Sequence, residues 1–372
     1  MELDPVWDSL NHTVASGWAP GIVAGVRHRG ATTIFATGHK DLDGTAEMAP
    51  DTPFRVASLS KLVGGALAVS MLADGFFGLD DPVERWLPEL ANPRVLASPA
   101  AALDQTVPAD GPVTVRQLLT LTNGMGVIFG KTPLSDAIAE AGVGPAPIPP
   151  QMSDDEFMAR IGALPLAYQP GTRWAYGTGS DLLSVLLSRA GGAPLRHLLK
   201  ERITGPLGMD STRFFGAPDT LPPAYQSTAA GLEVFDPPDG VFSRSPQFET
   251  LGGGLVSTVP DYLAFLSALA DDTLLPAELR AQMTSQQLTS GQLAGMAEMG
   301  VPATSWGWQV SVETGVGRPW SAPGRYGWTG GMGTSAYVDP SRDLIGVVFS
   351  QRLMAGPNED FGYFWEPLAA AI

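Results

Sequence analysis

Two short runs of apolar and β-branched residues near the N-terminus predict a β-hairpin. Residues 21–27 (GIVAGVR) and 32–37 (TTIFAT) are separated by a short segment that includes Gly30, which is typical of a hairpin loop. A longer apolar stretch, residues 59–72, contains no proline and is rich in leucine, valine and alanine, with small polar residues before it. This pattern predicts a buried helix close to the centre of the molecule.

The pattern changes to helical segments between residues 80 and 240. These segments are separated by loops rich in proline and glycine. We expect residues 80–240 to form a mostly helical domain. Its predicted helices cover residues 115–120, 154–161, 180–190 and 195–202.

Runs typical of strands return near the C-terminus. A helix is expected over residues 260–269, after the glycines at 252–254, and an amphipathic segment ends the chain. The two ends, residues 1–79 and 241–372, therefore predict one α+β domain in which helices flank an antiparallel sheet. We expect the active site in the cleft between this domain and the inserted helical one. The predicted strands are 307–313, 325–328, 334–338 and 344–350, and the amphipathic segment is 361–372.

Composition narrows the possible functions. The chain has 22 Lys and Arg against 38 Asp and Glu, and its net charge of -16 repels nucleic-acid phosphates and anionic lipid. The absence of cysteine excludes disulfides, thiolate nucleophiles and thiolate metal sites. The four histidines lack metal-ligand spacing, and no glycine-rich segment has the complete pattern of a phosphate- or dinucleotide-binding loop. We therefore expect no metal, no cofactor and no nucleic-acid partner.

The first residues, MELDP, have neither the basic region nor the apolar region of a signal peptide. The longest apolar run, residues 62–73, is too short to span a bilayer. We expect a soluble, cytoplasmic protein that binds no membrane. No pattern in the chain indicates its oligomeric state.

Ser58 and Lys61 form an S-x-x-K motif at the start of the predicted buried helix. Residues at i and i+3 share one helix face, so the motif places an amine beside a hydroxyl. A serine hydroxyl is a poor nucleophile at neutral pH, and a lysine whose pKa is lowered can act as its base. A capping serine followed by a lysine produces the same pattern by chance, so the motif needs companions elsewhere in the chain.

Companion motifs follow in order along the chain. Tyr176 lies in the segment PGTRWAYGT, and Trp328, Thr329 and Gly330 open a β-type run. The other segments are 54–61 (FRVASLSK), 113–124 (VTVRQLLTLTNG), 205–209 (GPLGM), 252–258 (GGGLVST) and 327–339 (GWTGGMGTSAYVD). Together, over residues 22–372, they resemble the serine β-lactamase-related esterases, the family VIII carboxylesterases, which are similar to class C β-lactamases and penicillin-binding proteins. The resemblance implies the β-lactamase/penicillin-binding-protein-like fold.

The resemblance also implies roles for individual residues. Ser58 becomes the acylated nucleophile, Lys61 its proton-accepting neighbour, and Tyr176 the tyrosine that helps to activate Ser58 or the deacylating water. A phenol with a pKa near 10 acts as a base only where a cation stabilises the phenolate, and Lys61 is the nearest candidate. Which of the two takes the proton in each step stays open. The backbone N–H groups of Ser58 and Gly331 are implied to form the oxyanion hole.

Two positions depart from the β-lactamase pattern. Thr178 stands where asparagine usually holds a substrate amide, and Trp328 stands where those enzymes carry the lysine of K-T-G. That lysine offers a positive charge to the carboxylate of a β-lactam, whereas tryptophan offers an apolar face and one N–H donor. The departures favour neutral esters, and we expect Thr178, Trp328 and Gly330 to contact the substrate.

Other residues are weaker candidates. Leu121 and Asn123 stand where the family often has histidine and serine, and we expect structural consequences only. Six aromatic residues could line a substrate pocket, although aromatic residues near strands are more often core. They are Trp174, Trp306, Trp308, Trp320, Tyr326 and Phe361.

The sequence therefore predicts a serine hydrolase that acts on small-molecule carboxylic esters with short to medium acyl chains, through an acyl-enzyme on Ser58. An acyltransferase or amide-forming enzyme of the same clan is the first alternative, because the acceptor at deacylation cannot be read from sequence. A β-lactamase or D-amino-acid peptidase is less favoured because the cation of K-T-G is missing. A non-catalytic binding protein is disfavoured because Ser58, Lys61 and Tyr176 are all present.

Overall fold

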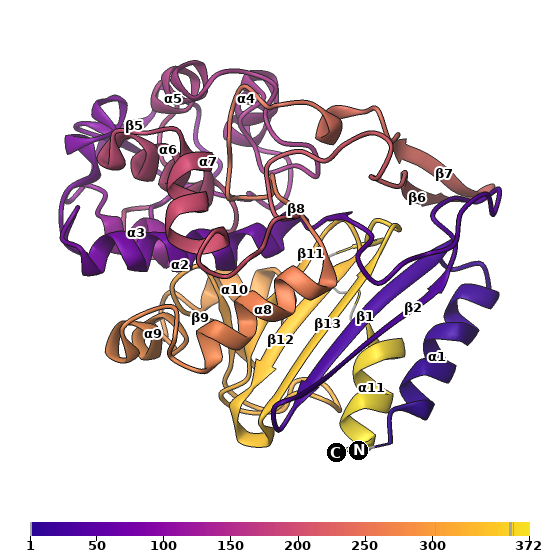
Figure 1. The fold of residues 1–372 in the computed structure, drawn as a ribbon. Coiled ribbons are helices and arrows are strands. Elements are labelled where there is room, and N and C mark those ends of the chain that lie inside the picture. The colour runs from indigo at the N-terminus through magenta and orange to yellow at the C-terminus, as the bar shows by residue number, and fades with distance from the viewer. Residues whose placement is uncertain (1, 302, 357–358, 360) are drawn as a thin grey trace.

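A seven-stranded antiparallel sheet forms the centre of one half of the molecule (Figure 1). The computed structural model describes residues 2–301, 303–356, 359 and 361–372. The strand order is β2-β1-β13-β12-β11-β10-β9, so strands from the two ends of the chain lie side by side. The α+β class and the shared sheet are confirmed. The strands are β1 (Gly21–His28), β2 (Ala31–Gly38), β9 (Thr304–Trp306), β10 (Ser311–Glu313), β11 (Tyr326–Gly330), β12 (Thr334–Asp339) and β13 (Leu344–Ser350).

Helices cover both faces of this sheet. The helices α1 (Asp4–Ala15) and α11 (Gly362–Ala370) lie next to each other on one face, and α8 (Val259–Ala270) lies on the other (Figure 1). Two glycines let the helices approach closely. A Cβ on Gly25 of β1 would lie 2.4 Å from the Leu263 side chain of α8. A Cβ on Gly346 of β13 would lie 2.6 Å from the Trp365 ring of α11.

The helix α2 (Ser60–Ala73) lies between the sheet domain and a helical region. Its residues from Ser60 to Val69 are all buried, because other elements cover the helix on every side. The four helices predicted for the middle of the chain are confirmed, and α7 continues into a π-helical turn at Lys200–Thr204. They are α3 (Val115–Leu119), α5 (Asp154–Gly162), α6 (Thr178–Gly191) and α7 (Leu195–Leu199).

Several elements were not predicted. The same middle stretch contains two small hairpins, β4 (Arg94–Leu96) with β5 (Thr106–Pro108) and β6 (Ala224–Thr228) with β7 (Gly231–Asp236). Their strands are short, and two of the four contain proline or glycine, so they lack a strong strand pattern. The remaining elements are β3 (Phe54–Arg55), β8 (Val256–Ser257), α4 (Pro133–Ala141), α9 (Ala277–Met283) and α10 (Ala294–Glu298).

The prediction of one strand over residues 307–313 is wrong. β9 ends at Trp306 and β10 begins at Ser311, and between them the chain turns through Gln309, whose φ is +62°. The Gln309 side chain is buried in the helical region, where its Nε2 donates to Leu118 O at 2.8 Å and its Oε1 accepts from Ser180 Oγ at 2.6 Å. Bonds to distant segments therefore interrupt a run that looks like a strand.

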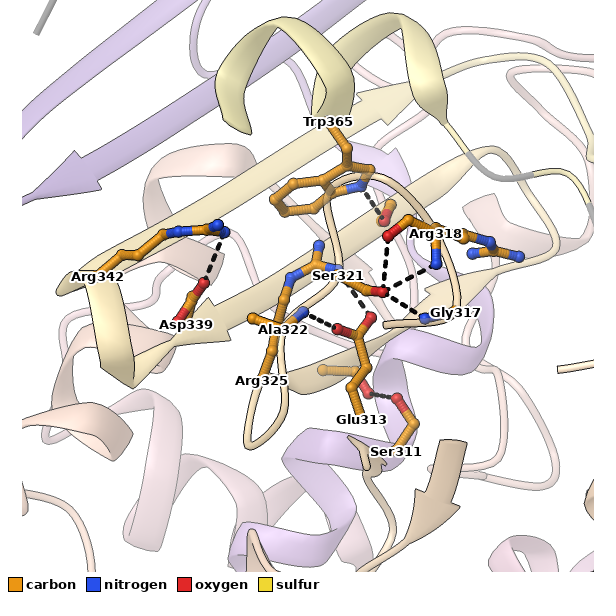
Figure 2. A network of polar contacts seen from close by, with 12 residues as sticks. Ser311, Glu313, Gly317, Arg318, Ser321, Ala322, Arg325, Asp339, Arg342 and Trp365 are labelled. Atoms are coloured by element: carbon orange, nitrogen blue, oxygen red, sulfur yellow. Dashed lines mark hydrogen bonds and ion pairs between the residues drawn. The ribbon is translucent and has the colours of Figure 1, made fainter. Parts of the chain in front are cut away.

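A buried polar network holds α11 and the β10–β11 connection against the sheet (Figure 2). The Arg325 guanidinium lies 4.0 Å from the Tyr337 ring centroid and 4.3 Å from that of Trp365. Its Nη1 bonds Glu313 Oε1 at 2.8 Å, and Trp365 Nε1 donates to Ser335 Oγ at 3.0 Å. Cation–π contacts and a desolvated ion pair thus replace water around this cation.

Candidate active site

Ser58 lies in a 3-10 turn, η1 (Ala57–Leu59), immediately before α2. The preceding residue, Ala57, has φ +46°, a left-handed conformation that is uncommon outside glycine. Contacts from distant segments hold this turn in place. Thr334 Oγ1 donates to Val56 O at 3.0 Å, and Tyr262 Oη donates to Leu59 O at 2.8 Å. The half-buried Ser58 side chain is thereby presented to a cavity.

Lys61 lies one helical turn after Ser58, as the motif predicts. Its Nζ donates to Ser58 Oγ at 3.2 Å and also bonds the backbone carbonyl of Gly252. The side chain is only 3% exposed. The Lys61 nitrogen is therefore held by the protein and faces the serine hydroxyl.

Tyr176 comes from the loop before α6 and completes the cluster. Its ring centroid lies 4.8 Å from Lys61 Nζ, and its hydroxyl accepts a hydrogen bond of 2.7 Å from Trp328 Nε1. The rings of Trp174 and Trp306 pack against it, with centroids 5.7 and 6.0 Å away. Packing by these aromatic residues fixes the phenol next to the lysine.

A cavity of about 400 Å³ opens over Ser58, Lys61 and Tyr176. Its wall is mostly apolar and rich in proline. Lys61, Tyr176 and Asp181 are the titratable residues in its lining, within the part of the chain that the structure describes. The remaining lining residues are Ala57, Val127, Phe129, Gly144, Pro145, Ala146, Pro147, Pro149, Pro150, Gly177, Thr250, Gly252, Gly253, Met299 and Gly331.

Gly331, the predicted oxyanion-hole residue, lies in the cavity wall. A Cβ placed on it would meet no atom within 4 Å. Its neighbour Gly330 is different, because a Cβ there would lie 2.3 Å from Val56 O. The structure thus brings Ser58, Lys61, Tyr176 and Gly331 to one cavity.

The three predicted substrate-contact residues do not line this cavity. Thr178 is 1% exposed at the start of α6, Gly330 packs against Val56, and Trp328 is 4% exposed behind Tyr176. Their contact with a substrate stays a prediction. For Trp328 the structure offers another partner, the Tyr176 hydroxyl.

The weaker candidates lie outside the cavity lining. Trp174 and Trp306 support Tyr176, and the buried Asn123 bonds the Met125 carbonyl through Nδ2 at 3.3 Å. The Leu121 carbonyl accepts from Ala175 N–H at 2.8 Å, which ties the helical region to the Tyr176 loop. The other aromatic candidates are buried core residues: Trp308, Trp320, Tyr326 and Phe361.

Asp181 was not predicted as a site residue. It lies in the first turn of α6, and its Oδ1 accepts a 2.5 Å hydrogen bond from Thr250 Oγ1. Burial raises the pKa of the Asp181 carboxyl, and the Thr250 hydrogen bond and the Lys61 charge oppose that rise. Its position five residues after Tyr176 was the available signal, but an acidic residue in a first helical turn is common for other reasons.

The described residues contain no group of three or more His, Asp or Glu residues placed to hold a metal ion. None of their helices is long and apolar enough to cross a membrane.

Comparison with known proteins shows the family to which this chain belongs. The family model described as Beta-lactamase matches residues 9–365. The chain belongs to the beta-lactamase family. The Mycobacterium tuberculosis protein Rv1367c is 34% identical over 368 residues, which cover 93% of this chain and 89% of that protein. Esterase EstB of Burkholderia gladioli is 29% identical over 394 residues, which cover 95% and 92% of the two chains.

A solved structure shares the fold of this chain. EstCE1, described as a hydrolase with promiscuous acyltransferase activity, superposes with a TM-score of 0.83 at 24% identity, covering 99% of this chain and 97% of that one. The likeness confirms the β-lactamase/penicillin-binding-protein-like fold. The resemblance to the β-lactamase-related esterases is also confirmed, and the protein is an enzyme of the serine β-lactamase clan.

Proposed function

We propose that this protein is a carboxylesterase that hydrolyses neutral esters through an acyl-enzyme on Ser58. The observation that carries the proposal is the contact of Lys61 Nζ with Ser58 Oγ at 3.2 Å, with the Tyr176 ring beside the same nitrogen. A hydroxyl next to an amine and a phenol has the partners that it needs to lose its proton. The similarity to esterase EstB supports the same reaction.

In the proposed mechanism, Ser58 Oγ attacks the ester carbonyl carbon. The serine proton passes to the Lys61–Tyr176 pair, and the backbone N–H groups of Ser58 and Gly331 stabilise the oxyanion. The C–O bond to the alcohol then breaks, and the pair returns the proton to the departing alcohol. Water attacks the acyl-enzyme in the same way, which releases the carboxylic acid and restores the serine.

The volume and the charge of the cavity support the proposal that the substrates are neutral esters with short to medium acyl chains. Its volume of about 400 Å³ is within the ordinary range for small-molecule sites. Among the described residues of its lining, Lys61 is the only cation, and Ser58 and the Gly252 carbonyl already engage it. A free positive charge for a substrate carboxylate is therefore not available in this wall, which disfavours β-lactams.

Mass spectrometry tests the proposal directly. After a short pulse of p-nitrophenyl butyrate and an acid quench, we expect a butyryl adduct on Ser58. Ser58→Ala should abolish the adduct and lower turnover by several orders of magnitude. Turnover that persists in Ser58→Ala would refute the proposal, as would turnover of nitrocefin that exceeds ester hydrolysis.

Acyl transfer is the second candidate function. The acyltransferase activity in the description of EstCE1 and the apolar cavity wall both favour it. An alcohol acceptor added at increasing concentration separates the two functions, because transfer yields a new ester in place of the acid. Hydrolysis that dominates at high acceptor concentration would exclude transfer as the main activity.

A further inference from the structure

Asp181 is a buried carboxylate to which the proposed mechanism assigns no step. It is 8% exposed and lies in the cavity wall. Its Oδ1 bonds the side chain of Thr250, which is 69 residues away, instead of an amide of its own helix. Helix capping therefore does not account for its burial, and a buried carboxylate without a strong partner is costly.

A continuous set of hydrogen bonds leads from Asp181 to Lys61. Thr250 Oγ1 donates to Asp181 Oδ1 at 2.5 Å and accepts from the Gly252 N–H at 2.8 Å. The Gly252 carbonyl in turn accepts from Lys61 Nζ. A Cβ on Gly252 would lie 2.4 Å from Asp181 Oδ1, so only glycine lets this backbone lie against the carboxylate.

Few charges of the described residues act on Asp181. Lys61 of α2 is the charged group that acts on it, and Tyr176 of the preceding loop is the other titratable residue in the cavity lining. The charge of Lys61 lowers the pKa of Asp181, so the carboxylate interacts electrostatically with the lysine that faces Ser58. Neutralising it would change both the charge balance of the cavity and the anchor of the Gly252 carbonyl.

We propose that Asp181 is a positioning residue, which acts through Thr250 and the Gly252 backbone to hold Lys61 beside Ser58 and to balance its charge. The kinetic consequence for esters rests on the proposed function. The consequence for the reactivity of Ser58 is independent of the proposed function, because a phosphonylating reagent measures that reactivity without ester turnover.

The test uses the full-length protein and a fluorophosphonate that labels activated serines. Asp181→Asn keeps the shape of the side chain but removes its charge, and Thr250→Val keeps the volume but breaks the hydrogen-bonded path. We expect each variant to label Ser58 about 100-fold more slowly than wild type near pH 8. Thr250→Ser restores the hydroxyl and should label at close to the wild-type rate.

The pH dependence separates a charge effect from a purely structural one. A protonated Asp181 is nearly isosteric with asparagine. Burial raises the pKa of Asp181, so wild type should lose its advantage over Asp181→Asn as the pH falls through that raised pKa. A structural role would leave the ratio of the two labelling rates constant with pH.

Asp261→Asn is the matched control. Asp261 also lies in a first helical turn, accepts a hydrogen bond from a threonine, Thr212, at 2.9 Å, and has its pKa raised by burial, but it is outside the cavity lining. We expect this variant to label Ser58 at the wild-type rate at every pH. Thermal melts of all variants exclude unfolding as the cause of any loss.

The outcomes are distinguishable. Equal labelling of wild type and Asp181→Asn near pH 8 overturns the role of Asp181, whatever the ester activity. If the fluorophosphonate labels wild type but no butyryl adduct forms, the proposed esterase function is refuted. The labelling rates of wild type and Asp181→Asn then still decide whether Asp181 positions Lys61. Wild type that reacts with neither reagent overturns both proposals, because Ser58 is then not an activated nucleophile.

Discussion

The indole N–H of Trp328 donates a 2.7 Å hydrogen bond to the hydroxyl oxygen of Tyr176. Strand β11 thus supplies a neutral donor to the phenol, while Lys61 of α2 approaches the same ring with its positive charge. In general, a hydrogen-bond donor and a cation stabilise the negative charge that a phenol must carry on its oxygen in order to take a proton from a serine.

The first prediction concerns this hydrogen bond. Trp328→Phe keeps an aromatic ring against Tyr176 but removes the donor. A hydrogen bond to a charged group contributes about 1.5–3 kcal/mol, so we expect kcat/KM for p-nitrophenyl butyrate to fall about 10-fold to 100-fold. Stopped-flow measurement of the p-nitrophenol burst would locate the loss in acylation.

Trp306→Phe is the control for that substitution. Trp306 also packs against Tyr176, but its buried Nε1 has no hydrogen-bond partner among the described residues. We expect a similar loss of stability from the smaller ring and a much smaller loss of activity. Equal losses of activity in the two variants would show that packing, and not the N–H group, matters.

The second prediction compares two adjacent glycines. Gly330→Ala should destabilise the fold by about 1–3 kcal/mol, because its Cβ would lie 2.3 Å from the Val56 carbonyl, beside the Ser58 turn. Gly331→Ala meets no atom within 4 Å and should leave the free energy of unfolding unchanged. Its methyl group lies at the cavity wall, however, and should lower kcat/KM. Urea unfolding together with ester kinetics checks both halves, and a destabilised Gly331→Ala would contradict the assignment of open space there.

The third prediction concerns the stability contribution of Asp181. Its pKa is raised in the folded state, so the stability that its protonated form contributes at low pH is lost as the pH rises through that pKa. Near pH 8, Asp181→Asn should therefore have a free energy of unfolding at least as high as wild type, although Ser58 reacts more slowly. The stability advantage should shrink as the pH falls. Urea unfolding at several pH values measures it, and a large destabilisation near pH 8 would contradict the prediction.

The fourth prediction concerns the buried pair beneath α11 (Figure 2). Burial raises the pKa of Glu313 and lowers that of Arg325, although each partner's charge opposes the shift of the other. Glu313→Ala leaves the buried guanidinium without its ion-pair partner and should cost about 3 kcal/mol of stability.

The surface pair of Arg27 and Asp271 is the comparison for this substitution. The Asp271 side chain is 47% exposed, so Asp271→Ala should change the free energy of unfolding by less than about 1 kcal/mol. Both variants should retain ester hydrolysis, because neither pair lines the cavity. Similar destabilisation in the two variants would contradict the importance of burial.

Local pattern was sufficient for much of the fold. The hairpin of β1 and β2, the buried helix α2 and the strands β12 and β13 were predicted within a few residues, because each has a strong apolar or β-branched run bounded by turn residues. The spacing of Ser58 and Lys61 also follows from helix geometry alone. Tyr176 and Gly331 needed the resemblance to a family, since nothing in their own segments points to Ser58.

The failures have a common cause. The run at 307–313 is broken because Gln309 bonds Leu118 and Ser180, which lie more than a hundred residues away in sequence. Asp181 was missed, and the bond of Trp328 to Tyr176 was not predicted, for the same reason. Each depends on which side chain from a remote segment arrives next to it.

The amino-acid order was enough to specify the strands of both chain ends, the helix that carries the S-x-x-K motif and the lack of thiol chemistry, because these depend on neighbours within a few residues or on composition. The path from Asp181 through Thr250 to Lys61, the bond of Trp328 to Tyr176 and the apolar wall of the cavity came only with the packed molecule. These features depend on contacts between side chains that are dozens of residues apart in sequence. The periodicity of hydrophobic and polar residues carries no information about such contacts.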